Sequence, residues 1–192
     1  MSTAHKLATW DALASRPTKD RSEIIEGVLV TPPSPLPRHA RIQAGIAREI
    51  GGPFDADDGN KGKPGGWWIL ADIDVRLSRH DIVCPDAASW HRSRLPNPWD
   101  VLPIGVTPDW ICEVLSPSNA SHDRVTKRRL YARCGIPHFW IIDPDARVLE
   151  ALRLDRAKRW VEVGVFDDKK PVRIEPFQSI ALDLRRLFPP RG

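Results

Sequence analysis

An apolar strand with a glutamate in its middle is predicted at DWICEVL, residues 109–115. Side chains alternate between the two faces of a strand, so Glu113 shares its face with Ile111 and Leu115. Burying an unpaired carboxylate on that face would cost roughly several kcal/mol. Glu113 therefore needs a cation beside it, and the neighbouring sequence has to supply one.

A candidate cation lies on the helix that the sequence predicts at about residues 122–134. Asp123, Lys127, Leu130 and Cys134 fall at i, i+4, i+7 and i+11 and form one stripe along that helix. The stripe is polar at its start and apolar at its end, so a helix packed on the sheet would hold the lysine ammonium near the carboxylates. The alternative is that Lys127 and its basic neighbours form a solvated helix face.

A second carboxylate ends the run DIVCPD at residues 81–86, which predicts a short strand followed by Asp86. The proline-rich connection 91–107 then has to bring Asp86 and Glu113 together. Two carboxylates on neighbouring strands make a hard oxygen site of the kind that Mg²⁺ or Mn²⁺ occupies. The simpler alternative is that Asp86 only ends a strand.

Together these segments form a family pattern that covers most of the chain. The sequence resembles the Uma-two family of endonucleases, which belongs to the PD-(D/E)XK, restriction-endonuclease-like group. The residues that carry this resemblance are EIIEG at 23–27, His39, Pro85-Asp86, Pro108-Asp109, EVLSPS at 113–118, Asp123, Lys127, Tyr131 and GIPHFWIIDP at 135–144.

The resemblance implies an α/β fold, with a restriction-endonuclease-like core in which helices flank a mixed central β-sheet. It implies an endonuclease that hydrolyses DNA phosphodiester bonds with Mg²⁺ or Mn²⁺. Asp86 and Glu113 would be the metal ligands and Lys127 the cationic partner. The sequence departs from the common superfamily motif, which has its lysine two residues after the acidic residue, where this chain has Leu115.

Three further residues are weaker candidates for the same site. Glu23 matches an early glutamate of the family and would add a metal or water contact. Asp123 could bond the lysine or the helix N-terminus, and His39 could touch a phosphate. Taken alone, His39 is more often an ordinary residue at a helix start than a base, and Asp123 is more often an ordinary charge in a first helical turn than a catalyst.

Length and composition point to a single domain over residues 1–192. We expect a short N-terminal helix, a core over about residues 21–155, and a C-terminal strand and tail. The net charge of +4 favours an acidic partner, most commonly nucleic acid. Three dispersed cysteines indicate reduced core residues of a cytoplasmic protein, and no apolar run is long enough for a membrane span. A homodimer would follow only by analogy with other nucleases.

Periodicity predicts the remaining elements in order. Residues 23–30 read as one strand in which Gly27 allows a turn or a bulge, and residues 39–50 as a helix. Three short strands are expected to form a meander, at 67–70, 73–77 and 82–88. Three later strands and a packed tail follow, at 138–142, 148–154, 160–166 and 180–188.

Two other functions remain open at this stage. One is a nuclease-fold protein that binds nucleic acid or a partner without catalysis, since a fold does not fix function. The other is a carbohydrate-active protein, because the chain has eight tryptophans and paired carboxylates. Core packing accounts for the tryptophans in predicted strands, which leaves Trp90 and Trp99 as loop candidates for sugar stacking.

Overall fold

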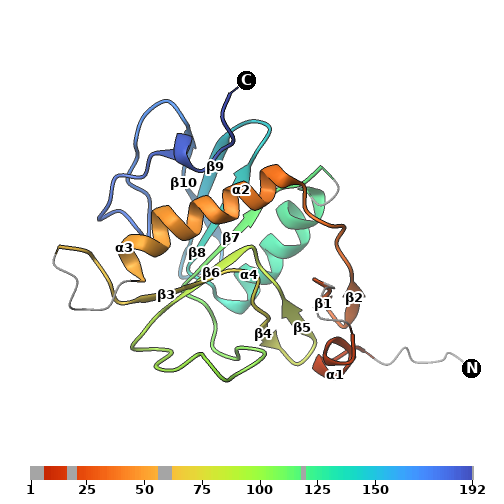
Figure 1. Ribbon diagram of the computed structural model, residues 1–192. Coiled ribbons are helices and arrows are strands. Elements are labelled where there is room, and N and C mark those ends of the chain that lie inside the picture. The colour runs from red at the N-terminus through yellow and green to blue at the C-terminus, as the bar shows by residue number, and fades with distance from the viewer. Residues whose placement is uncertain (1–6, 17–20, 56–61, 118–119, 192) are drawn as a thin grey trace, which may run out of the picture.

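A six-stranded mixed sheet forms the centre of the molecule in this computed structural model, which describes residues 7–16, 21–55, 62–117 and 120–191 (Figure 1). Its strand order is β10-β9-β8-β7-β6-β3. Only β7 and β8 run parallel, and the other neighbours are antiparallel. The strands are β3 (Trp67–Leu70), β6 (Ala87–His91), β7 (Trp110–Val114), β8 (His138–Asp143), β9 (Val148–Leu154) and β10 (Trp160–Asp167).

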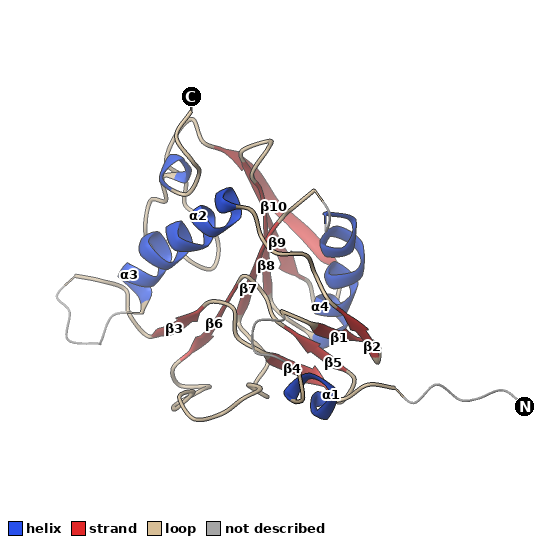
Figure 2. Ribbon diagram, turned by 45° about the vertical axis from the view of Figure 1, so that its right-hand side comes forward, coloured by secondary structure: helices blue, strands red, loops and turns tan. Residues whose placement is uncertain are grey.

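Helices cover both faces of this sheet, as Figures 1 and 2 show. On one face α2 (Pro37–Ile46) continues into the π-helical turn η1 (Ala47–Gly51) and the short α3 (Gly52–Phe54). On the other face the π-helical turn η2 (His122–Lys127) continues into α4 (Arg128–Cys134). The predicted α/β fold with a helix-flanked mixed sheet is confirmed.

Strand β7 shows why the sheet lies between two helical layers. Cys112 and Val114 point into the core that contains Ile42 and Ile46 of α2. Ile111 and Leu115 point into the second core, to which α4 contributes Leu130 and Tyr131. Both faces of β7 are therefore buried, as the apolar sequence around Glu113 predicts.

A second, four-stranded antiparallel sheet lies beside the first, with the order β2-β1-β5-β4. Its strands are β1 (Glu23–Ile25), β2 (Val28–Val30), β4 (Val75–Ser78) and β5 (Asp81–Val83). The segment 23–30 is thus a hairpin, and its turn residues Glu26 and Gly27 both have positive φ, 53° and 77°. The small helix α1 (Trp10–Ala14) packs near β1.

The expected meander of three adjacent strands is wrong. β3 pairs with β6 in the large sheet, whereas β4 and β5 pair with each other in the small one. The run 82–88 therefore divides into the end of β5 and the start of β6, which belong to different sheets. Proline at position 85 lies at the break, where it lacks the N–H that a ladder needs.

The C-terminal tail packs on the α2 side of the large sheet and contains the 3-10 helix η3 (Leu184–Arg186). Its buried side chains are Ile174, Phe177, Leu182, Leu184, Leu187 and Phe188. Within the described ranges, no helix is both long and apolar enough to cross a membrane.

Candidate functional site

Residues far apart in the sequence meet in a cleft of about 180 Å³. Strands of both sheets, helix α2 and the turn η2 contribute to its lining. Asp86 directly precedes β6, and since Ala87 pairs with Cys112 in β7, Asp86 comes opposite Glu113. All six residues singled out from the sequence line this cleft, and each is at most 6% exposed. They are Glu23, His39, Asp86, Glu113, Asp123 and Lys127.

Lys127 is the centre of a buried cluster of carboxylates. Its Nζ lies 2.9 Å from Glu23 Oε1, 3.1 Å from Glu113 Oε1 and 3.7 Å from Asp123 Oδ1. Lys127 is 5% exposed, so the helix carries its ammonium inward and not to solvent. The cation that Glu113 needs is therefore the one on η2, and the solvated-face alternative does not apply to Lys127.

The protonation of this cluster follows from its burial and its charges. Burial alone would lower the pKa of Lys127, but Glu113, Glu23 and Asp123 outweigh it and hold the pKa well above its usual value. Burial raises the pKa of Glu113 well above its usual range, against the opposing effect of Lys127. Burial also raises the pKa of Asp123 to about 6. The cleft thus favours a cation and disfavours additional negative charge.

Tyr131 is a member of this cluster to which the sequence assigned no role. Its hydroxyl donates a hydrogen bond to Glu113 Oε1, the same oxygen that Lys127 contacts. Tyr131 lies one helical turn after Lys127, and its ring packs edge-on against Phe139 in β8 at 5.1 Å. The i+4 spacing from Lys127 was a usable signal, because side chains four apart lie on one helical face.

Asp86 is held by a separate hydrogen-bond network. His39 Nε2 lies 3.0 Å from Oδ2, and the Val114 N–H donates to the same oxygen at 2.7 Å. Oδ1 accepts from Arg21 at 2.8 Å and from Gln43 at 3.2 Å. Burial alone would raise the pKa of Asp86, but His39 and Arg21 outweigh it and lower the pKa below its usual value. Asp86 is therefore fixed as a carboxylate.

Arg21, Gln43 and Asp72 are the parts of this network that the sequence did not reveal. Arg21 forms an ion pair with Asp72 as well as with Asp86, and Gln43 donates to Asp72 Oδ1 at 2.9 Å. Gln43 lies at i+4 from His39 on α2, which was a usable signal. Arg21 and Asp72 lie in irregular segments, where no periodicity marks a position as facing the cleft.

The carboxylate oxygens of the cleft fit a hard divalent cation. The protein would supply only some of the ligands of such an ion. Within the described residues, no three His, Cys, Asp or Glu side chains are placed so that they could hold a metal by themselves. Mg²⁺ commonly takes one or two carboxylates and completes its shell with waters and a substrate phosphate. Both contacts of Glu113 described above use Oε1, which leaves Oε2 for such an ion.

The cysteines take no part in this chemistry. Cys84 lines the cleft, but burial raises the pKa of its thiol to about 12, so it is not the nucleophilic thiolate at neutral pH. Cys84, Cys112 and Cys134 are all free.

The tryptophan positions weaken the carbohydrate alternative further. Trp90 is not a loop residue but part of β6, fully buried, with its indole N–H donated to the Val106 carbonyl at 2.8 Å. The expectation that it is available for sugar stacking is wrong. Trp99 is 62% exposed, packs edge-on against Trp68 at 4.9 Å and does not line the cleft that holds the carboxylates.

Comparison with known proteins assigns the chain to a family. The Uma2 (Uma-two) family profile, described as "Putative restriction endonuclease", matches residues 7–185. The chain is also similar to the crystal structure of a "putative nuclease belonging to DUF820" from Anabaena variabilis ATCC 29413. That likeness has a TM-score of 0.71 and 26% sequence identity, and covers 94% of this chain and 97% of the other. No curated protein matches the sequence. The profile match spans nearly the whole chain, and the protein belongs to the Uma2 family.

Proposed function

We propose that this protein is a divalent-metal-dependent endonuclease that hydrolyses phosphodiester bonds of DNA in the cleft around Lys127. The observation that carries the proposal is the buried Lys127 ammonium, which lies 3.1 Å from the strand carboxylate Glu113 in the cleft that also contains Asp86. A buried lysine between carboxylates, with Asp86 in the same cleft, combines the groups that phosphoryl chemistry requires.

Asp86 and Glu113 would hold the metal, Mg²⁺ or Mn²⁺. When bound, such an ion lowers the pKa of a water and offsets charge on a phosphate oxygen. Lys127 would stabilise the negative charge that develops on the phosphate, because its ammonium is desolvated and already oriented. Glu23, Asp123 and Tyr131 would keep Lys127 and Glu113 in place through the contacts described above.

Asp72 gives this site a way to exchange ligands at Asp86. A carboxylate has about four lone-pair directions, and those of Asp86 are taken by Arg21, Gln43, His39 and the Val114 N–H. A metal would have to replace one of them. Arg21 and Gln43 both also contact Asp72, so either could leave Asp86 and keep a carboxylate partner.

The four hydrogen bonds that Asp86 already accepts also favour a second candidate, a nuclease-fold protein that binds nucleic acid without catalysis. If Arg21 and Gln43 never leave Asp86, the cleft cannot use that carboxylate for a metal. Calorimetric titration with Mn²⁺ separates the two candidates. Binding that Asp86→Asn and Glu113→Gln each abolish supports the enzyme, and absence of binding supports the second candidate.

The direct test is nicking of supercoiled plasmid by purified protein with Mg²⁺ or Mn²⁺. We expect nicking by the wild type, none with EDTA, and none by Asp86→Asn, Glu113→Gln or Lys127→Met. Lys158→Met is the matched control, since Lys158 is an exposed lysine that does not line the cleft. Circular dichroism and thermal unfolding would establish that each variant folds. Inactive wild type, or equal activity in all variants, would refute the proposal.

A further inference from the structure

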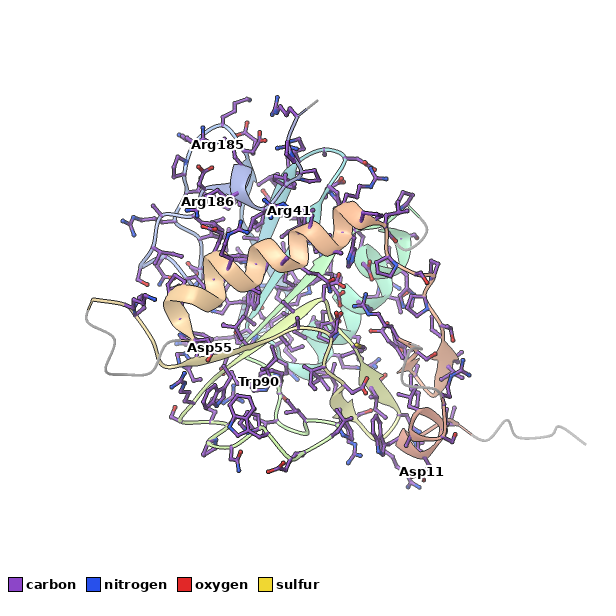
Figure 3. The ribbon with its side chains drawn as sticks, in the orientation of Figure 1. Asp11, Arg41, Asp55, Trp90, Arg185 and Arg186 are labelled. Carbon is purple, nitrogen blue, oxygen red and sulfur yellow. The ribbon has the colours of Figure 1, made fainter. Side chains whose placement is uncertain are left out.

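A second concave surface lies on the α2 side of the molecule, formed by α2, the β8–β9 turn and the C-terminal tail. It is a groove of about 480 Å³, called here the basic groove. Five cations line it, with one carboxylate: Arg41, Arg147, Lys169, Arg185, Arg191 and Asp168. Figure 3 shows Arg41 on α2 in the same part of the molecule as Arg185 and Arg186 of the tail.

Ion pairs and hydrogen bonds hold the side chains at the base of this groove in position. Asp168 is 5% exposed and forms ion pairs of 2.7 Å with both Arg147 and Arg191. Arg147 also donates to the Pro189 carbonyl at 2.8 Å and lies over the Phe188 ring at 4.8 Å. Cations that are already held in position lose less conformational entropy when a ligand binds.

Close packing joins α2 to the tail along one side of the groove. A Cβ added at Gly45 of α2 would lie only 2.9 Å from the Cα of Leu187. Glycine therefore permits this approach, and it fixes the tail cations relative to Arg41.

The groove has a surplus of positive charge that its own carboxylates do not neutralise. Among the described residues, Lys169 and Arg185 form ion pairs with the neighbouring Asp167 and Asp183, and because both cations are exposed such pairs contribute little. Within the described residues, Arg41 has no carboxylate partner, and its contact is with the Arg186 carbonyl at 3.5 Å.

The groove and the candidate active site lie on different sides of α2, which joins them. His39 contacts Asp86 from the first turn of this helix, and Arg41, two residues further on, points to another side of it. Arg38, Arg41 and Arg48 recur along that side over roughly 15 Å, and Arg38 and Arg48 also form ion pairs with Asp145 and Glu49. A DNA duplex presents one phosphate per strand about every 3.4 Å, so several phosphates would face this length.

Resting on the proposed nuclease function, we propose that the basic groove binds the backbone phosphates of duplex DNA while another phosphodiester of the same duplex lies in the cleft. The lining favours nucleic acid over a protein partner, because none of the large exposed hydrophobic side chains of the described residues belongs to it. The contacts are to phosphates, so the groove would add affinity without sequence preference.

The test is the salt dependence of binding to a labelled DNA duplex, measured by fluorescence anisotropy in EDTA so that no cleavage occurs. Arg41→Glu, alone and with Arg185→Glu, should weaken binding by roughly tenfold or more and reduce the slope of log K against log salt by about one per lost contact. The matched control is Arg129→Glu, since Arg129 is also an exposed helical arginine without a carboxylate partner among the described residues, but lies on α4.

Unchanged slope and affinity in the Arg41→Glu variants would overturn the proposal, as would an equal loss in Arg129→Glu or no duplex binding by the wild type. A protein that binds through the groove and never nicks plasmid would refute the nuclease function and leave the groove assignment standing. Thermal unfolding of each variant excludes misfolding as the cause.

Discussion

The cleft and the basic groove use charge in opposite ways. The cleft is lined by four carboxylates and two permanent cations, all but Arg21 buried and each paired with an opposite charge in the cleft. The groove is lined by five cations and one carboxylate, and most of its cations are exposed. Buried charges are costly unless they are paired in fixed geometry, whereas exposed charges remain available to a partner. The difference separates a region suited to chemistry from a region suited to holding a polyanion.

The largest expected effect is the loss of the cation at the centre of the cleft. Lys127→Met leaves Glu23, Glu113 and Asp123 buried without it, and breaking such a pair costs about 3–5 kcal/mol. We expect that loss in the free energy of unfolding by urea, and loss of plasmid nicking.

The double variant Lys127→Met with Glu113→Gln should recover part of the stability and none of the activity, because it removes one of the unpaired carboxylates. The exposed control Lys169→Met should change stability by less than about 1 kcal/mol. Equal losses of stability in Lys127→Met and Lys169→Met would mean that the two regions do not differ as described.

Tyr131→Phe should have the next largest effect. The ring keeps its packing against Phe139, while Glu113 loses a buried hydrogen-bond donor, which costs about 1–3 kcal/mol. Nicking should fall without a change in duplex binding, since Tyr131 is not part of the groove. A variant with weaker DNA binding and normal nicking would contradict this division.

Asp72→Asn should weaken metal binding by roughly tenfold, a typical effect of a residue that supports a metal ligand. Its removal leaves Arg21 and Gln43 with Asp86 as their remaining carboxylate, so the metal has to compete with both. Calorimetric Mn²⁺ titration checks this, with Asp100→Asn as an exposed control. Tighter binding in Asp72→Asn would show that Asp72 opposes the metal site.

The smallest effects should appear in the pH dependence of stability, with opposite signs in the two regions. The Arg147 hydrogen bond lowers the pKa of Asp168, so its stabilisation is present above about pH 4 and is lost as the pH falls through the lowered pKa. Burial raises the pKa of Glu113, so stability there is greatest with the proton bound and falls as the pH rises through the raised pKa.

Urea unfolding of wild type, Asp168→Asn and Glu113→Gln over a range of pH measures both contributions. On acidification the advantage of wild type over Asp168→Asn should shrink, while wild type should gain stability relative to Glu113→Gln. If both stability differences between wild type and variant changed in the same direction with pH, the two regions would not differ electrostatically as described.

The pairing of Lys127 with Glu113 could be predicted because each residue violated its local pattern. A carboxylate on a buried strand face requires a cation, and the helical stripe offered Lys127 at a position that apolar residues continue. The central strands β7 to β10 were recognisable for a related reason, since their apolar runs are bounded by clear turns.

The division into two sheets could not be predicted from the same signals. The short runs 73–77 and 82–88 would show the same apolar pattern in either sheet. The strand with which each run pairs depends on contacts remote in sequence. Arg21 and Asp72 were missed because an exposed-looking charge in a loop carries no sign of what it faces. The groove depends on the tail folding back over α2, which no local pattern indicates.

One helix joins the residue that contacts Asp86 to the arginine that lies in the groove. His39 and Arg41 are on the same rigid element, so the separation between the two regions cannot vary from one bound duplex to another. With DNA in the groove, α2 would fix the distance between the bound phosphates and the cleaved bond. Cleavage would then occur at a constant offset from those phosphates. A duplex too short to reach both regions would not be cleaved, whatever its sequence.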